Sequence, residues 1–246
     1  MLVAVVIFVI SWFVRLPTFV INSIQINGAD SDIAPLLQIA ADKTLEGNYM
    51  GIFSRRSIIT YPRSALVKNL MNLSPRIDSV IVHADGLHQI LIAVIEKTPS
   101  AIACPELPDF DNHSLTGCYL VDKNGFAFQN VPDSYPQTFD HFYAPAAILG
   151  SFIASSTRFS QLQNAYDIVS QNGINVQGIL IKPDYEYEMY VKGKSDMTVI
   201  YFNEVQPILK EISNLITFWS NSAVASSSTS SLEYVDVRYG SNIFYR

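Results

Sequence analysis

Residues 76–99 read RIDSVIVHADGLHQILIAVIEKTP, and this stretch decides the fold that we expect for the first part of the chain. Two apolar runs flank Asp85 and Gly86, a pair that is typical of the tight turn in a β-hairpin. We therefore predict two antiparallel strands around this turn, and the second strand closes a first domain near Glu96.

The residues before this hairpin predict one strand and two helices. Residues 19–28 form an apolar-rich strand that ends at Gly28, where the chain must turn. Residues 30–42 and 61–75 have the apolar spacing of helices, and Pro62 suits the first turn of the second helix. The expected cap of the first helix is Asp30, Ser31 or Asp32, and the expected apolar faces are Ile33, Leu36, Leu37 and Ala40, then Leu66, Leu70 and Leu73.

From about residue 100 the pattern becomes mainly β, with two further helices. An Asn-Gly pair inside residues 119–128 predicts a second hairpin. Residues 185–202 alternate between apolar and polar side chains, which predicts two strands of a sheet that has one face exposed to solvent. Residues 156–173 and 203–219 have helical spacing, and the serine-rich residues 221–231 predict a flexible connector. The expected buried positions are Tyr185, Tyr187, Met189 and Val191, opposite Glu186 and Glu188, and in the helices Phe159, Leu162, Tyr166, Val169, Val205, Ile208, Leu209, Ile212, Leu215, Ile216 and Trp219. The sequence thus predicts an α+β protein.

Composition limits the function. The chain has 246 residues, of which 49% are hydrophobic and 15% are charged, so disorder of the whole chain is excluded. Its net charge is −6, and it has no basic cluster that would neutralise phosphates. We therefore expect protein partners and no nucleic acid.

The N-terminus is strongly apolar. Its first fourteen residues carry no charge. A helix of that length reaches about 21 Å, against a hydrocarbon core of about 30 Å. We favour an uncleaved transmembrane anchor over residues 1–16, in which Arg15 snorkels, and we expect a short basic tail to be missing before Met1. A cleaved signal peptide and a buried core helix remain as alternatives, although no small-residue cleavage site follows the apolar run. Arg15 alone does not decide the orientation.

The order of these segments carries a resemblance. An apolar N-terminus, then FVINSIQINGAD (19–30), two short helices, residues 74–101 and YLVDKNGFAF (119–128) resemble the FtsQ/DivIB family of bacterial cell-division proteins. This resemblance implies a POTRA domain (β-α-α-β-β) over residues 17–99 and a mainly antiparallel β domain with packed helices over residues 100–246. It also implies a non-enzymatic divisome scaffold, a single-pass protein of the cytoplasmic membrane with most of its chain extracytoplasmic, which acts in septum formation.

The last segment is the expected partner-binding site. Residues 234–240, YVDVRYG, resemble the family signature near the end of the β domain, where family members bind the small bitopic proteins FtsB and FtsL. The following residues, SNIFYR, contain neither lysine nor proline, two residues that commonly protect an edge strand. We expect a partner to add a strand to this open edge. We expect a site formed by Arg238, Tyr239, Ser241, Ile243 and Tyr245, of which Tyr239 and Ser241 match the family motif best. Packing of these side chains against the neighbouring strand and the last helix remains an alternative.

The two cysteines, Cys104 and Cys118, predict a disulfide in an extracytoplasmic domain. The bond would close a loop of about 15 residues, for which chain-entropy models give about 3 kcal/mol. Two unpaired thiols remain an alternative. So does zinc bound by Cys104, His113 and Cys118, although a fourth ligand is not evident.

The sequence gives little support to catalysis. It contains no GxSxG, HExxH, P-loop or GxGxxG motif, and its four histidines, His83, His88, His113 and His141, lack ligand spacing. Residues 109–114 start like a calcium loop but lack its glycine and its closing glutamate. We expect no catalytic residue, cofactor, metal or small-molecule substrate. The main functional alternative is a membrane-anchored POTRA protein of the export or outer-membrane assembly class; a cell-envelope hydrolase is a weaker one.

Overall fold

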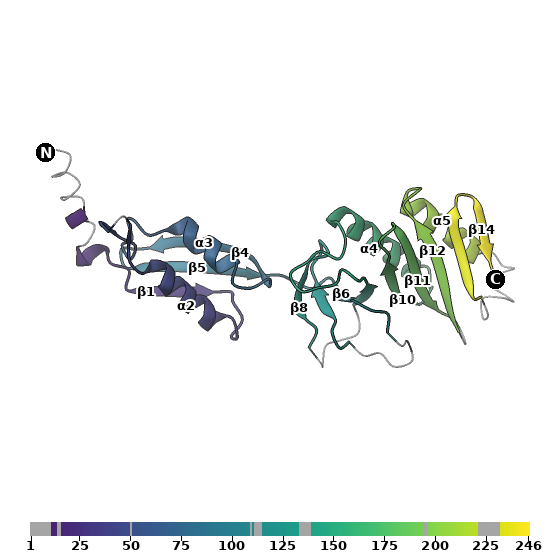
Figure 1. Ribbon diagram of the computed structural model, residues 1–246, viewed down its shortest axis with the longest axis horizontal. Coiled ribbons are helices and arrows are strands. Elements are labelled where there is room, and N and C mark those ends of the chain that lie inside the picture. The colour runs from purple at the N-terminus through teal and green to yellow at the C-terminus, as the bar shows by residue number, and fades with distance from the viewer. Residues whose placement is uncertain are drawn as a thin grey trace. The chain divides into compact units, whose positions relative to one another are not determined.

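The computed structural model divides the chain into two compact units, Met1–Lys97 and Thr98–Arg246, which we call unit 1 and unit 2 (Figure 1). Each unit is described by itself. The structure describes residues 11–13, 16–49, 51–108, 110, 115–132, 139–193, 196–220 and 232–246.

Unit 1 contains a three-stranded sheet in the order β1-β5-β4, with two helices packed on it. Strand β5 pairs antiparallel with β4 and parallel with β1. The hairpin predicted around Asp85 and Gly86 is confirmed, and Gly86 has a φ of 74° in the loop that joins its strands. The elements are β1 (Ser23–Asn27), α2 (Ala34–Leu45), β2 (Asn48–Tyr49), β3 (Phe53–Ser54), α3 (Arg63–Met71), β4 (Ile77–Asp85) and β5 (Gln89–Glu96).

Two residues that were expected in the core of unit 1 lie outside it. Leu37, Leu66 and Leu70 are fully buried as predicted, but Leu36 and Leu73 are exposed. The buried residues of α2 follow an i, i+4 row that ends at Leu45, which turns Leu36 away from the sheet. Leu73 lies beyond the last residue of α3 and therefore does not share its buried face.

The expected side-chain cap of α2 is also wrong. Among the described residues no side chain caps this helix, and Asp30 and Asp32 instead bind the guanidinium of Arg76 at 2.6 and 2.7 Å. Arg76 also pairs with Glu96 at 2.7 Å. Arg76 thus ties the residues that precede α2 to the end of β5. The cluster is partly desolvated, because the side chain of Arg76 is only 14% exposed.

Unit 2 is built on a mixed sheet of nine strands, in the order β14-β13-β12-β11-β10-β9-β6-β7-β8 among the described residues. The chain is α+β as predicted. Three of the eight strand pairs are parallel (β6–β9, β9–β10 and β12–β13), so the sheet is less uniformly antiparallel than expected. The elements are β6 (Ala101–Cys104), β7 (Tyr119–Val121), β8 (Ala127–Asn130), β9 (Asp140–Tyr143), α4 (Ser156–Gln171), β10 (Val176–Ile181), β11 (Glu186–Lys192), β12 (Met197–Asn203), α5 (Ile208–Trp219), β13 (Tyr234–Tyr239) and β14 (Asn242–Tyr245).

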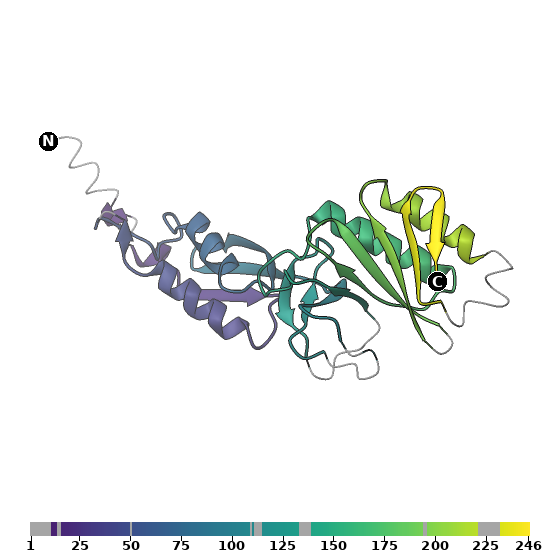
Figure 2. The same ribbon diagram turned by 45° about the vertical axis from the view of Figure 1, so that its right-hand side comes forward.

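Helices α4 and α5 cover one face of this sheet (Figure 2). Tyr187, Met189 and Val191 alternate onto that face and are buried, as predicted. Tyr185 was expected to join them but is exposed. It precedes β11 with a φ of 61°, a left-handed conformation that removes it from the strand alternation.

Helix α5 starts later than the sequence indicated. It begins at Ile208, after Pro207, and its buried apolar residues include Ile212 and Leu215. Val205 is 83% exposed because it precedes the helix, and Leu209 is also exposed, so both positions were wrongly assigned to the core.

Several expectations concern residues outside the described part of the chain. They include most of the anchor predicted over residues 1–16, the connector at 221–231, and His113 with most of the calcium-like loop. Where the structure does describe the chain, none of its helices has both the length and the apolarity needed to cross a bilayer.

Candidate functional site

The candidate site is the outer edge of β14. Within the part of the chain that the structure describes, β14 pairs with β13 on one side and with no strand on the other. Figure 1 shows β14 as the last strand of the sheet in unit 2. An unpaired edge presents backbone N–H and C=O groups that a second chain can bind.

The strand register identifies the groups that point outward. Tyr234 and Arg246 exchange backbone hydrogen bonds of 3.4 and 3.3 Å, and Asp236 is opposite Phe244 two residues along. Because antiparallel pairs alternate, the backbone groups of Phe244 point toward β13. The register of β13 shifts between Asp236 and Tyr239, opposite Ile243, and Tyr239 is opposite Asn242. Because Asn242 and Phe244 are both opposite residues of β13, alternation along β14 itself points the backbone groups of Ile243 and Tyr245 away from β13. The edge therefore offers two alternating donor–acceptor positions, which is the pattern required for strand addition.

The side chains of β14 present a different surface on each face of the sheet. Ile243 is half-buried against the core, and the ring of Tyr245 lies 5.1 Å from that of Phe218 in α5. On the other face, Phe244 makes an edge contact with Tyr239, with ring centroids 5.4 Å apart. Tyr239, Phe244 and Tyr245 are 58%, 53% and 56% exposed. A strand added here would find aromatic surface on both of its faces.

Arg238 forms ion pairs that link strands within unit 2. It forms a two-point ion pair with Asp236, at 2.9 and 2.6 Å, and a third contact with Glu186 of β11 at 3.0 Å. Hydrogen bonds with Asp236 raise the pKa of the guanidinium, which also lies 5.4 Å from the ring centre of Tyr201. Arg238 thus connects β13 to β11 across β12. Its contact with a partner remains a prediction.

The turn between β13 and β14 rests on α5. Ser241 is exposed in this turn, next to Gly240, whose φ of 70° suits a tight reversal. The side-chain amide of Asn214 donates a 2.7 Å hydrogen bond to the Gly240 carbonyl. Helix α5 therefore positions the turn and, through it, the open strand.

The predicted disulfide lies away from this edge. Cys104 and Cys118 are bonded, with Cα atoms 4.2 Å apart and both residues buried. They belong to a small apolar cluster with Leu120 and Tyr143. Because β6 and β14 stand at different places in the strand order, the disulfide lies in another part of unit 2.

The sequence analysis did not predict the placement of two residues near the edge, Phe244 and Glu211. Phe244 is as exposed as the aromatic residues that were chosen, and the alternation of β14 could have placed it on the face of Tyr239. Glu211 was not among the positions expected to be buried in this helix, but it is completely buried. Helical spacing could have signalled this, because Glu211 lies three residues after Ile208 and four before Leu215, and both of these are buried.

No known family model and no curated protein matches the sequence. The proposals that follow therefore depend on the geometry of the two units and on the resemblance described above.

Proposed function

We propose that this chain is a non-enzymatic scaffold of bacterial cell division, which binds FtsB/FtsL-like bitopic proteins through the outer edge of β14. One observation carries the proposal: Ile243 and Tyr245 direct their backbone groups away from the sheet, between exposed aromatic side chains. Main-chain hydrogen bonds would supply affinity, and the side chains of the two faces would supply specificity.

The arrangement of unit 1 supports the same proposal. The strands of its three-stranded sheet and its two helices follow in the order expected of a POTRA domain, and the short pair β2–β3 lies between the helices. In this proposal, unit 1 is a POTRA domain and residues 1–16 form a transmembrane anchor. Both units then lie outside the cytoplasm. A reporter that is active only outside the cytoplasm, fused after Arg246, tests the orientation. A silent reporter, with a cytoplasmic reporter active at the same position, would reverse it.

The experiment compares two substitutions at one position. Ile243→Pro removes an outward N–H and leaves the bonds between β13 and β14 in place, whereas Ile243→Ala shortens the side chain and keeps the N–H. One lost hydrogen bond costs about 1 kcal/mol, and the proline ring also obstructs the edge. We expect Ile243→Pro to bind the FtsB/FtsL-like pair at least tenfold more weakly than Ile243→Ala.

Tyr239 provides a side-chain test with its own control. Tyr239→Ala should weaken binding by the roughly 2 kcal/mol that an aromatic anchor contributes, and Tyr239→Phe should lose much less. Thermal unfolding of each variant establishes that unit 2 remains folded. If Ile243→Pro and Tyr239→Ala both stay folded and bind with unchanged affinity, the partner does not use this edge.

A further inference from the structure

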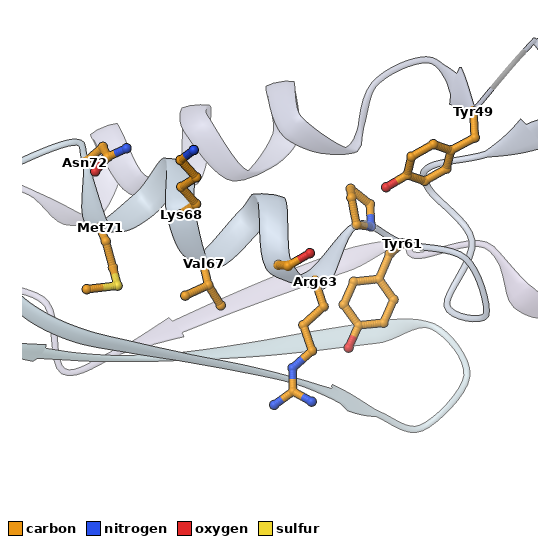
Figure 3. Close-up of a pocket in the computed structure, with 9 residues that line it drawn as sticks. Tyr49, Tyr61, Arg63, Val67, Lys68, Met71 and Asn72 are labelled. Carbon is orange, nitrogen blue, oxygen red and sulfur yellow. The ribbon is translucent and has the colours of Figure 1, made fainter.

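A second surface, in unit 1, has the chemistry of a binding site. Beside α3 lies a hollow of ≈ 760 Å³, whose walls include Tyr49, Tyr61, Val67 and Met71. Figure 3 shows Val67 and Met71 projecting from α3 in the same general direction as Tyr61, with the hydroxyl of Tyr49 directed toward the start of the helix. The walls are thus aromatic and aliphatic, and Met71 is an adaptable side chain.

Cations surround this hollow. Arg63 and Lys68 line it directly. A neighbouring hollow of ≈ 550 Å³ shares Tyr49 with it and is lined by Lys43 and Arg55. The guanidinium of Arg55 lies 5.1 Å from the ring centre of Tyr49, and its Nε is buried with no hydrogen-bond partner among the described residues. We refer to the two hollows together as the α3 groove.

In the described part of unit 1, ion pairs involve most of the carboxylates but none of the cations that line the α3 groove. The described part of unit 1 has seven Lys and Arg residues and seven Asp and Glu residues. Its ion pairs are Arg56 with Asp42, Lys97 with Asp78, and Arg76 with Asp30, Asp32 and Glu96. Lys43, Arg55, Arg63 and Lys68 are the four cations left without an ion pair in that part, and all four line the α3 groove. The remaining carboxylates, Glu46 and Asp85, line neither hollow.

This distribution selects among possible occupants. The described part of unit 1 is balanced in charge, yet its unpaired positive charge is gathered around an apolar concavity. The occupant has to bring negative charge to the cations and an apolar group to the hollow of Tyr49, Tyr61 and Met71. A peptide can satisfy both features, because carboxylates and an apolar side chain alternate along one chain. Complementary charge of this kind also steers association.

We propose that the α3 groove binds an acidic peptide segment of a partner protein. An aromatic or aliphatic side chain of that segment enters between Tyr61 and Met71, and its carboxylates pair with Arg63 and Lys68. This site lies in the other unit from β14, and its existence does not depend on the strand-addition proposal.

The test selects peptides without assuming a sequence. A displayed library of random 12-residue peptides is selected against the full chain, and the enriched peptides are synthesised and titrated. We expect enrichment of Asp and Glu around Leu, Phe or Trp. The double charge reversal Arg63→Glu with Lys68→Glu should weaken binding at least tenfold, and the neutral pair Arg63→Gln with Lys68→Gln should weaken it less.

A matched control separates local from overall charge. Lys192→Glu with Lys210→Glu makes the same charge change at exposed positions of unit 2 and should alter binding by less than twofold. Rising salt should weaken peptide binding to the unaltered chain, because exposed ion pairs are screened.

Three outcomes would overturn the proposal. One is enrichment of basic or uncharged peptides, and another is enrichment of acidic peptides that bind the reversed variant equally well. The third is a lack of enriched peptides, together with binding to vesicles containing anionic phosphatidylglycerol that the Arg63 and Lys68 reversal weakens. That last result would assign the groove to a lipid surface.

Discussion

The carboxyl group of Glu211 lies under the strands that carry the candidate edge. One oxygen accepts a 2.9 Å hydrogen bond from the backbone N–H of Asn203, and the other is buried with no hydrogen-bond partner among the described residues. Burial raises the pKa of this carboxyl from 4.5 to about 7, while the hydrogen bond from Asn203 opposes the shift. The charge of Asp236 raises the pKa further, and that of Arg238 lowers it. We predict that this one residue makes unit 2 less stable at neutral pH than at acidic pH.

The sign and size follow from the two pKa values. Between pH 4.5 and about 7 the folded chain keeps the proton of Glu211 and the unfolded chain loses it. The free energy of unfolding therefore falls as pH rises through this window. A shift from 4.5 to about 7 corresponds to about 3 kcal/mol of unfolding free energy, present below the window and lost above it. Glu211→Gln cannot ionise, so it should be the more stable protein at pH 8.

Trp219 provides a local probe, because it lies on α5 with Glu211. Replacing Trp12 by Phe leaves Trp219 as the single tryptophan of the chain. Urea unfolding is then followed by fluorescence at several pH values between 4 and 8, with and without Glu211→Gln. Other carboxyls, such as Asp140, whose pKa burial raises to about 6, contribute equally to both proteins and cancel in the comparison.

The exposed Glu233 gives the matched control. Glu233→Gln should show little pH-dependent difference, because this side chain is exposed and its ion pair with Arg246, at 3.4 Å, is exposed as well. A constant stability difference between Glu211→Gln and the unaltered chain from pH 4 to 8 would refute a buried, proton-retaining Glu211.

Three further predictions concern stability. Replacing Cys104 and Cys118 by Ala should lower the unfolding free energy of unit 2 by about 3 kcal/mol, measured by urea unfolding, and an unchanged midpoint would contradict a stabilising bond. Gly28→Ala should destabilise unit 1 strongly, because Gly28 has a φ of 84° and a Cβ there would lie 2.2 Å from the carbonyl oxygen of Val94. Gly47→Ala, with a φ of 80° but open space around it, should cost only about 1 kcal/mol, and equal thermal shifts would argue against the close approach at Gly28. Arg76→Met should destabilise unit 1 by roughly 1 to 3 kcal/mol by leaving three carboxylates unpaired, and this loss should shrink at acidic pH. A loss that persists after the carboxylates are protonated would point to packing instead.

Turn chemistry made the hairpins predictable. Asp85-Gly86 marks the end of β4, and Asn124-Gly125 lies between β7 and β8; in both cases the two strands pair as expected, since glycine allows the positive φ these turns need. Helix α4 was predictable for a similar reason. Phe159, Leu162 and Val169 repeat at helical spacing and are all buried.

Some strands and strand pairings could not be predicted, because they depend on contacts between distant segments that local sequence patterns do not show. Strands β6 and β9 are short and do not alternate, so nothing in their sequence distinguishes them from buried loop. The parallel pairings of β1 with β5 and of β12 with β13 join segments distant in sequence. At the candidate site, the alternation of residues 234–246 indicated the terminal strands. The outward direction of the Ile243 and Tyr245 backbone required the register.

Amide exchange at β14, in the full chain with and without the proposed FtsB/FtsL-like partner, addresses the proposed function at single residues. In the free chain, the amide of Phe244 faces β13 and should exchange slowly, whereas those of Ile243 and Tyr245 face outward and should exchange fast. Strand addition predicts that a saturating partner slows Ile243 and Tyr245 and changes Phe244 comparatively little. If the partner binds and these two amides still exchange at their free rates, the β14 edge is not where it pairs.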